Sequence, residues 1–588
     1  MTDVEKEKID VALARAMYHS GCPLSLFEST YWRHAFSLLR PSYEIPSTYK
    51  FSGVLLDAEY DRAKDLGKKQ IDEALSVAIV SDGWTNLRGE GIVNFVVCTP
   101  NPVFFKAIEP GENRETADYV AAEMIKVIEE VGPEKVMLFA TDNARAMKNA
   151  LEIVKAKYPH IAVVGCIAHS LNLLLGDLLK LRLFKDATEC AKNVIKHVKR
   201  TRVISAHFTK RQTDVHGQKT LTLKLPSPTR FAGAAIMLDS LIFNKEALQQ
   251  TVVIKDLNVD KDVRSNVLDE ESFWPKVTSC LETIQPVADA ILKIEGDSAV
   301  LSDVPEIFYD LSRTVIAALE SAKQSKLKKQ VEKIIPYRKE FSCQPVHFAA
   351  NLLDPRYKGE HLSKDEILSA IDYVNQVADH LHLDCSKVMA NLAEYRMNSG
   401  LWSRESVRNA AKSIKTHVWW QGMCAGEELT PIAARLLRLP PHSISSERVW
   451  SGYGRIHSKT RNRLKNEKVQ KLVTLQMSLR LQSGQYPKKR SSKRKIRSVR
   501  QDEQEKDTER DLSDRSSTED SSSEDDDWDE EEDIGCNKEG DADWVDFEDS
   551  SEDDGDATEE SEDLNGVASQ KPNAKNPRRS KRISGALA

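Results

Sequence analysis

The order of strand and helix patterns between residues 74 and 181 is the feature that most constrains the fold. Three apolar or β-branched segments come first, at 74–80, 91–98 and 103–108, and such a succession indicates an antiparallel meander. Two further short apolar segments alternate with helical patterns, which indicates parallel strands joined by helical crossovers. These later elements are a helix at 116–130, a strand at 135–140, a helix to about 158, a strand at 161–165 and a helix at 166–181. The sequence therefore predicts an α/β fold with a mixed five-stranded sheet.

Helical patterns flank this α/β segment on both sides. Residues 1–70 indicate helices with loops, and strand patterns fade after about residue 185, leaving residues 186–430 mostly helical. The last apolar block predicts two more helices, one after Pro440-Pro441 and one from Lys468 to about Leu481. A chain of 588 residues exceeds what one hydrophobic core supports, so we expect several domains.

Charge is distributed in blocks along the chain. The formal net charge is −7, but residues 501–570 alone carry 32 acidic and 4 basic side chains, and basic clusters flank them at 485–500 and 571–588. Residues 1–484 are consequently a mildly basic body with a net charge of +7. The tail cannot bury enough apolar surface to offset its chain entropy, so we predict that it is disordered.

Two classes of protein are excluded by composition. No run of about 18–20 apolar residues occurs, and the first ten residues lack an apolar signal region, so neither a membrane partner nor a secretory signal is expected. The 9 cysteines are scattered and form no Cys-x-x-Cys pair. Free thiols are therefore expected, and zinc fingers of the common types are not.

Three acidic residues are candidates for chemistry, although local structure is the simpler explanation of each taken singly. Asp82 follows the first strand pattern and precedes Gly83, and Asp-Gly is a common turn pair. Asp142 follows the fourth strand and precedes a helix, where Asp is a favoured N-cap. Glu447 lies early in a predicted helix, where an acid complements the helix dipole.

Taken together, the three acids indicate a metal site. Carboxylates at the ends of neighbouring strands can converge on one point, and like charges held close need a proton or a cation between them. Magnesium prefers oxygen ligands and completes its shell with water and phosphate. A pair of such ions would activate the attacking oxygen and stabilise the leaving one in phosphoryl transfer.

Four motifs resemble those of hAT-superfamily transposases, and the element order resembles the RNase H-like fold. The motifs are Ser81-Asp82-Gly83-Trp84-Thr85, Thr141-Asp142-Asn143-Ala144, Cys166-x-x-His169-x-Leu171-Asn172-Leu173, and Pro441-x-Ser443-x-Ser445-Ser446-Glu447-Arg448-Val449-Trp450-Ser451 followed by Lys459-Thr460-Arg461-Asn462-Arg463-Leu464. The likeness covers about residues 75–185 and 405–482 well, and the part between only in general character.

The resemblance implies an RNase H-like core interrupted by a large all-α insertion. Its domains would be an N-terminal helical region (1–70), the first part of the core (71–185), the insertion (186–404), a dimerisation region that completes the core (405–482) and the disordered tail (483–588). Asp82, Asp142 and Glu447 would be catalytic and bind Mg²⁺ or Mn²⁺ in an active enzyme. The candidates for DNA contact are Arg230, Phe231 and Arg448, and those for dimerisation are Trp450, Leu464, Val469, Leu472 and Val473.

The sequence departs from the family pattern at two places. Phe231 stands where the family usually has a Trp that stabilises a flipped or hairpinned DNA end, so stacking there would be weaker. No Cys-x-x-Cys or suitably spaced His pair precedes residue 75, where family members often have a BED-type zinc finger. Either the finger was lost, or the chain lacks its native start, or DNA is bound otherwise. Cys166 and His169 supply only two zinc ligands, so we interpret them as packed core.

The tail and the body together indicate a nuclear protein. Basic clusters such as 487–500 and 577–582 are typical of nuclear import signals and phosphate contacts, with a solvated charge run as the alternative. Ser521-Ser522-Ser523-Glu524-Asp525-Asp526 suits acid-directed phosphorylation. The expected partners are DNA, a second copy of the chain and, through the acidic tail, histones or chromatin proteins.

Two functions are compatible with these residues. The first is an Mg²⁺-dependent DNA transposase that cuts and joins strands as a dimer or larger assembly. The second is a catalytically inactive, domesticated transposase that acts as a dimeric nuclear DNA- or chromatin-binding regulator. The intact acidic triad favours the first, whereas Phe231 and the missing finger favour the second.

Overall fold

The computed structural model describes residues 1–484, apart from 87, 100, 112–115, 218–219, 227–231, 459–460 and 462–463. The tail for which we predicted disorder lies outside the described residues, and so do Arg230 and Phe231. Within the described part of the chain, no helix combines the length and the apolar character needed to cross a membrane.

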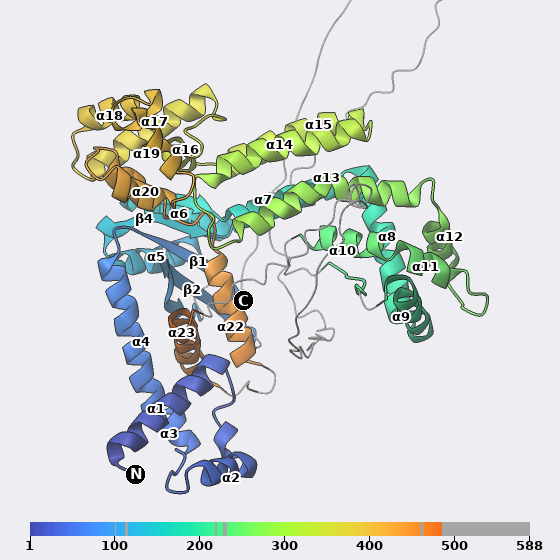
Figure 1. Cartoon of the computed structure of the whole chain (residues 1–588), viewed down its shortest axis with the longest axis horizontal. Helices are drawn as coiled ribbons and strands as arrows, with labels where there is room; N and C mark the ends of the chain where they lie inside the picture. Colours follow the sequence, from blue (N-terminus) through green and yellow to red (C-terminus); the bar gives the residue numbers. More distant parts are fainter. Residues whose placement is uncertain are drawn as a thin grey trace, which may run out of the picture. The chain divides into compact units, whose positions relative to one another are not determined.

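A mixed five-stranded sheet forms the α/β part of the chain, as the order of patterns predicts (Figure 1). Its strands are β1 Val77–Thr85, β2 Gly91–Cys98, β3 Pro102–Ile108, β4 Val136–Thr141 and β5 Ala162–Gly165. The spatial order is β3-β2-β1-β4-β5, with antiparallel pairing from β1 to β3 and parallel pairing from β1 through β4 to β5. The helices α5 Ala117–Val131, α6 Arg145–Lys157 and α7 Ile167–Lys180, with the short turn η2 Pro133–Lys135, follow the later strands as expected.

Helices make up most of the rest of the described chain. Before the sheet they are α1 Asp3–Ser20, η1 Leu26–Glu28, α2 Thr30–Leu39, α3 Thr48–Ser52 and α4 Val54–Glu73. After α7 they are α8 Arg182–Arg200, α9 Arg202–His216, α10 Gly233–Phe243, α11 Lys245–Val252, α12 Lys261–Leu268, α13 Phe273–Ile294, α14 Asp303–Ser321, α15 Ser325–Ser342, α16 Pro345–Leu353, α17 Lys364–His380, α18 Cys385–Met397, η3 Gly400–Ser403, α19 Glu405–Ala410, α20 Thr416–Met423 and α21 Thr430–Leu436. The two helices predicted for the last apolar block are α22 Ile444–Ile456 and α23 Asn466–Gln482.

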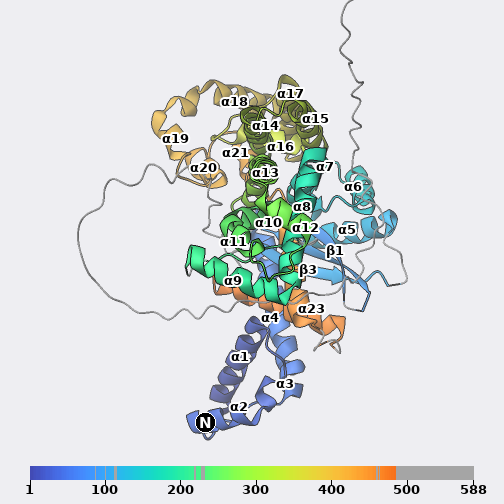
Figure 2. The same cartoon turned by 90° about the vertical axis from the view of Figure 1, so that its right-hand side faces the viewer.

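The last two helices return to the sheet. Helix α22 packs against β1 and β2, and α23 packs against β3, α1 and α4. Figures 1 and 2 both show α4 leading from the group of α1, α2 and α3 toward the sheet, beside α23. A segment that begins at residue 444 thus completes the surroundings of strands that end at residue 165.

Side chains of β1 alternate between two cores, one on each face of the sheet. Val77 and Ile79 belong to the core that includes residues of α5 and α6. Ala78 and Val80 belong to the other core, which includes residues of α4, α22 and α23. Because successive strand residues point to opposite faces, Asp82 lies on the face that α22 covers.

Candidate active site

Asp82 lies inside β1 and not in a turn after it. Strand β1 pairs with β2 from Ala78 as far as Thr85, and Asp82 stands opposite Asn94. The turn interpretation of the Asp82-Gly83 pair is therefore wrong, because residues 91–98 supply a partner that keeps this part of the backbone extended.

Asp142 and Glu447 reach the same region from other elements. Asp142 follows β4, and its Oδ1 accepts a hydrogen bond from the Ala144 amide at 3.1 Å. The N-cap of α6 is Ala144, so Asp142 is not the cap that local structure suggested. Glu447 lies in the first turn of α22, as predicted, and all three acids are partly buried.

Electrostatic coupling links the three carboxyl groups. Burial, and then the negative charges of Asp142 and Glu447, raise the pKa of Asp82 from 3.8 to about 8. A negative charge near a carboxyl group disfavours its ionised form and so raises its pKa. Two hydrogen bonds lower this pKa, one from the Gly83 backbone and one from Trp450, whose Nε1 donates to Asp82 Oδ2 at 3.0 Å. The charges of Asp142 and Glu447 therefore act on the carboxyl group of Asp82.

An aromatic cluster fixes α22 against β1 beside Asp82. Trp450 stacks on Trp84 with ring centroids 5.4 Å apart and an interplanar angle of 23°. Tyr453 contacts both rings, at 5.3 Å from Trp450 and 6.0 Å from Trp84. Asn94 of β2 adds a polar link, since its Nδ2 donates to the Ser446 carbonyl at 3.1 Å.

Sequence reasoning assigned no role to Asn94 or Trp84 at this site. Asn94 interrupts the apolar run of β2, and it is fully buried. A lone amide in a buried strand needs hydrogen-bond partners. The sequence therefore indicated that Asn94 has a polar partner. The partner could not be inferred because Ser446 lies 352 residues away.

The loop that carries Asp142 is held by its neighbour Asn143. Asn143 Nδ2 donates to Ser170 Oγ at 3.1 Å and to the Cys166 carbonyl at 3.4 Å. A Cβ at Gly165 would lie 2.0 Å from Asn143 Oδ1, so only glycine leaves room for this amide.

We expect Gly165→Ala to displace the Asp142 loop, which hydrogen exchange of residues 141–145 would detect. Gly426→Ala, at a position with open space around it, is the matched control.

Cys166 joins α7 to the segment that precedes α22. Its buried Sγ accepts a hydrogen bond from the Ser443 amide at 3.5 Å, and the Ile167 amide donates to the Pro441 carbonyl at 3.2 Å. Burial chiefly, and then the charge of Glu447, raise the pKa of the Cys166 thiol to about 11. These contacts support the interpretation of Cys166 as packed core; His169 is half-buried one turn later.

The other predicted site residues that the structure describes have partners inside the chain. Arg448 Nη1 contacts Asp297 Oδ1 at 2.6 Å, and its side chain is 14% exposed. Of the dimerisation candidates, Leu464 is partly buried, and the others are buried in the core that faces α22 and α23: Trp450, Val469, Leu472 and Val473. DNA contact by Arg448 and subunit contact by these apolar residues stay predictions.

The donor set suits a divalent cation in its chemistry. Three carboxyl groups, two of which raise the pKa of the third, concentrate negative charge that Mg²⁺ or Mn²⁺ would neutralise. Among the described residues, however, no group of three or more His, Cys, Asp or Glu side chains is gathered closely enough to hold a metal ion. Binding of a cation would therefore have to draw these carboxyl groups together.

His442, just before α22, makes this junction sensitive to acid. Burial, and then the charge of Arg448, lower the pKa of His442 from 6.5 to about 4, and its Nδ1 accepts from the Ile444 amide. A lowered histidine pKa supports folding above about pH 6.5 and costs stability as the pH falls toward 4. At pH 5 we expect a loss of about 2 kcal/mol relative to pH 7, measured by urea denaturation. His442→Asn should reduce this loss, whereas the exposed His207→Asn should not.

Three family models match parts of the chain. A domain of unknown function, DUF659, matches residues 46–194; the ZBED1 RNase-like helical domain matches 164–282; and the hAT family C-terminal dimerisation region matches 391–479. The human zinc finger BED domain-containing protein 4 is 22% identical in an alignment of 540 residues that covers 82% of this chain and 44% of that protein. The chain thus spans less than half the length of this relative.

The matched regions include the strands that carry Asp82 and precede Asp142, and also helix α22 with Glu447. Over these regions the chain is therefore similar to hAT-family transposase-like proteins.

Proposed function

We propose that this chain is a transposase-derived DNA-binding protein that cleaves and joins DNA strands by metal-assisted phosphoryl transfer at Asp82, Asp142 and Glu447. The observation that carries the proposal is the coupling of Asp82 to both other carboxyl groups, which come from three separate segments. Clustered acids with a raised pKa are a frequent mark of a functional site.

The topology supports an RNase H-like core. Three antiparallel strands are followed by two parallel strands, in the spatial order β3-β2-β1-β4-β5. Asp82 lies on β1, and Asp142 directly follows the neighbouring strand β4. In this proposal residues 71–185 form the first part of the core, and 405–482 complete it through α22. The helices from α8 to α18 would be the insertion between them, and residues 1–70 an N-terminal helical region.

In this mechanism the chain's own residues position the reacting groups. Asp82, Asp142 and Glu447 would hold Mg²⁺ or Mn²⁺, which supplies charge neutralisation for the attacked phosphate and a more acidic bound water. Trp450 orients the Asp82 carboxyl through the Nε1–H···Oδ2 hydrogen bond. The Trp84–Trp450 stack shields one side of that carboxyl from water, which strengthens every charge interaction in the site.

Nicking of supercoiled plasmid DNA by the full chain tests the proposal. Nicked circles should accumulate with Mg²⁺ or Mn²⁺ and stop when the metal is removed with EDTA. Asp142→Asn should lose the nicking and keep DNA binding in a gel-shift assay at low salt. Nicking that persists in the variant would assign it to a contaminant or to another site and refute the proposed triad.

A second function has an observation in its favour. Among the described residues the carboxyl groups do not form a preformed metal site, and Trp450 donates a hydrogen bond to one carboxylate oxygen of Asp82. A domesticated protein that keeps DNA binding and dimerisation but not catalysis would have this arrangement. The match to the C-terminal dimerisation region supports self-association in both cases. Nuclear location, and chromatin partners for the acidic tail, belong to this proposal as well.

A further inference from the structure

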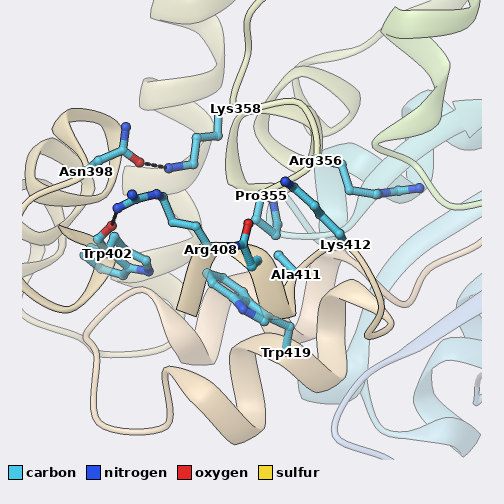
Figure 3. Close-up of a pocket in the computed structure, with 10 residues that line it drawn as sticks. Pro355, Arg356, Lys358, Asn398, Trp402, Arg408, Ala411, Lys412 and Trp419 are labelled. Atoms are coloured by element: carbon cyan, nitrogen blue, oxygen red, sulfur yellow. Dashed lines mark hydrogen bonds between the residues drawn. The ribbon is translucent and has the colours of Figure 1, made fainter. Parts of the chain in front are cut away.

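A basic pocket lies apart from the candidate active site. It has a volume of about 340 Å³ and is bordered by the turn after α16, the end of α18, η3, and helices α19 and α20. Figure 3 shows Lys358 and Arg408 on one side of it and Lys412 extending toward them from the other, whereas the Arg356 side chain points away from these three. The described residues that line it include these four cations and no acidic residue.

Three of the four cations have no ion-pair partner among the residues that the structure describes. Arg356 is neutralised by ion pairs with Asp354 at 2.7 Å and Asp303 at 3.1 Å. Lys358, Arg408 and Lys412 form no ion pair with any described residue. Lys358 is half-buried, and burial, followed by the positive charge of Arg408, lowers its pKa. The pocket thus concentrates positive charge that an anion would relieve.

Neutral groups hold two of these cations in place. Lys358 Nζ donates to Asn398 Oδ1 and lies 4.5 Å from the centroid of the Tyr395 ring. Arg408 Nη1 donates to the carbonyls of Trp402 and Ser403, both at 2.6 Å. Lys358 and Asn398 both have positive φ, at 53° and 52°, a conformation that costs energy in residues other than glycine. The cations are therefore positioned before any ligand arrives.

We propose that this pocket is an anion-binding site for the phosphorylated serine cluster of the chain's own acidic segment, residues 516–530. Each phosphoserine carries a charge of about −1.5 to −2 and three acceptor oxygens. Such a group stands at the end of a side chain and can enter a hollow that is too narrow for a duplex. The proposal does not depend on the proposed catalytic function.

The chain itself supplies the matching anion. Ser521, Ser522 and Ser523 are followed by Glu524 and three aspartates. Phosphorylation of these serines would therefore add negative charge to a short segment that is already strongly acidic. About 30 residues separate Gly484 from this segment, and they can span up to about 100 Å, more than the width of a typical domain. Tethering also raises the effective concentration of the segment far above that of a free ligand.

Zero-length crosslinking of the full chain tests this assignment. A carbodiimide joins lysine amines to carboxylates, and mass spectrometry then identifies the joined peptides. The chain is compared after treatment with an acid-directed serine kinase and ATP and after treatment with phosphatase. We expect crosslinks from Lys358 and Lys412 to acids of 516–530 that increase on phosphorylation and persist on dilution. They should be lost at 1 M salt, where the Debye length is about 3 Å.

Two variants give the test its specificity. Arg408→Gln keeps a donor for the neighbouring carbonyls but removes the charge, so the Lys412 crosslinks should be lost. Arg404→Gln, at an exposed position on the same segment, should leave them unchanged. Equal behaviour of the two variants, or crosslinks spread evenly over exposed lysines such as Lys69 and Lys387, would overturn the proposal. So would protection of Lys412 by a single-stranded oligonucleotide with no response to phosphorylation, which would assign the pocket to nucleic acid.

Discussion

Replacing Asp82 by Asn is expected to abolish metal-dependent DNA nicking and, at the same time, to stabilise the fold. Loss of a metal-binding carboxylate removes several kcal/mol of transition-state stabilisation, a decrease in rate of about 10³-fold or more. The gain in stability has a separate cause. Burial and the charges of Asp142 and Glu447 oppose ionisation of Asp82, and asparagine carries no charge while its Oδ1 still accepts from Trp450 Nε1.

The pH dependence of this stabilisation distinguishes it from other effects. The pKa of Asp82 rises from 3.8 to about 8 on folding, so ionisation costs nothing below about pH 4, and its cost grows until about pH 8. We expect Asp82→Asn to be more stable than wild type by about 1–3 kcal/mol at pH 8, after allowance for partial exposure, and by little at pH 4. Urea denaturation at several pH values measures this difference. The exposed Asp65→Asn should change stability by less than about 0.5 kcal/mol throughout.

Addition of metal ion tests whether the loss of nicking and the gain in stability have a common origin in metal binding at Asp82. Mg²⁺ or Mn²⁺ that binds the folded chain raises its stability in proportion to the logarithm of the ion concentration. Wild type should therefore gain thermal stability with added ion, and Asp82→Asn should gain much less. If neither protein responds and Asp82→Asn is still the more stable, the acids form a coupled site without a metal, and the inactive function is the better description.

Most of the α/β architecture could be predicted because its signals are local. Strand and helix patterns between 74 and 181 follow from side-chain periodicity, and Thr116 caps α5 as its sequence position suggests. The boundary of β1 was wrong because the apolar run ends at Val80 while pairing with β2 continues to Thr85. Pairing of this kind depends on a neighbouring strand, and a single segment does not encode it.

The surroundings of the site could be predicted only in part, because they depend on contacts between distant residues. The acids were identified from motifs, but the link from Trp450 to Asp82 joins residues 368 positions apart. The basic pocket was missed for the same reason, since Lys358 and Arg408 lie in separate segments. Helices α22 and α23 carry a large apolar set that includes Trp450, Val469 and Leu472. Residues of α1, α4 and the sheet cover much of it within the same chain.

Replacement of Trp450 tests whether this residue packs in the interior of the chain or at a subunit interface. Its side chain is 8% exposed, stacks on Trp84 and contacts Tyr453. Truncation of a buried tryptophan leaves a cavity, so Trp450→Ala is expected to lower the free energy of unfolding by about 3–5 kcal/mol. Urea denaturation of the full chain, followed by far-ultraviolet circular dichroism, measures this loss.

Trp450→Phe separates the hydrogen bond from the packing. Phenylalanine keeps aromatic contacts with Trp84 and Tyr453 but cannot donate to Asp82 Oδ2, so we expect a loss of about 1–3 kcal/mol at pH 8. The loss should be smaller in the Asp82→Asn background, because the asparagine Oδ1 still accepts from Trp450 Nε1 but carries no charge. Sedimentation of both Trp450 variants at folded concentrations gives the subunit state. A dimer that dissociates in Trp450→Phe, with unfolding stability unchanged, would place Trp450 at the interface and contradict its packing against β1.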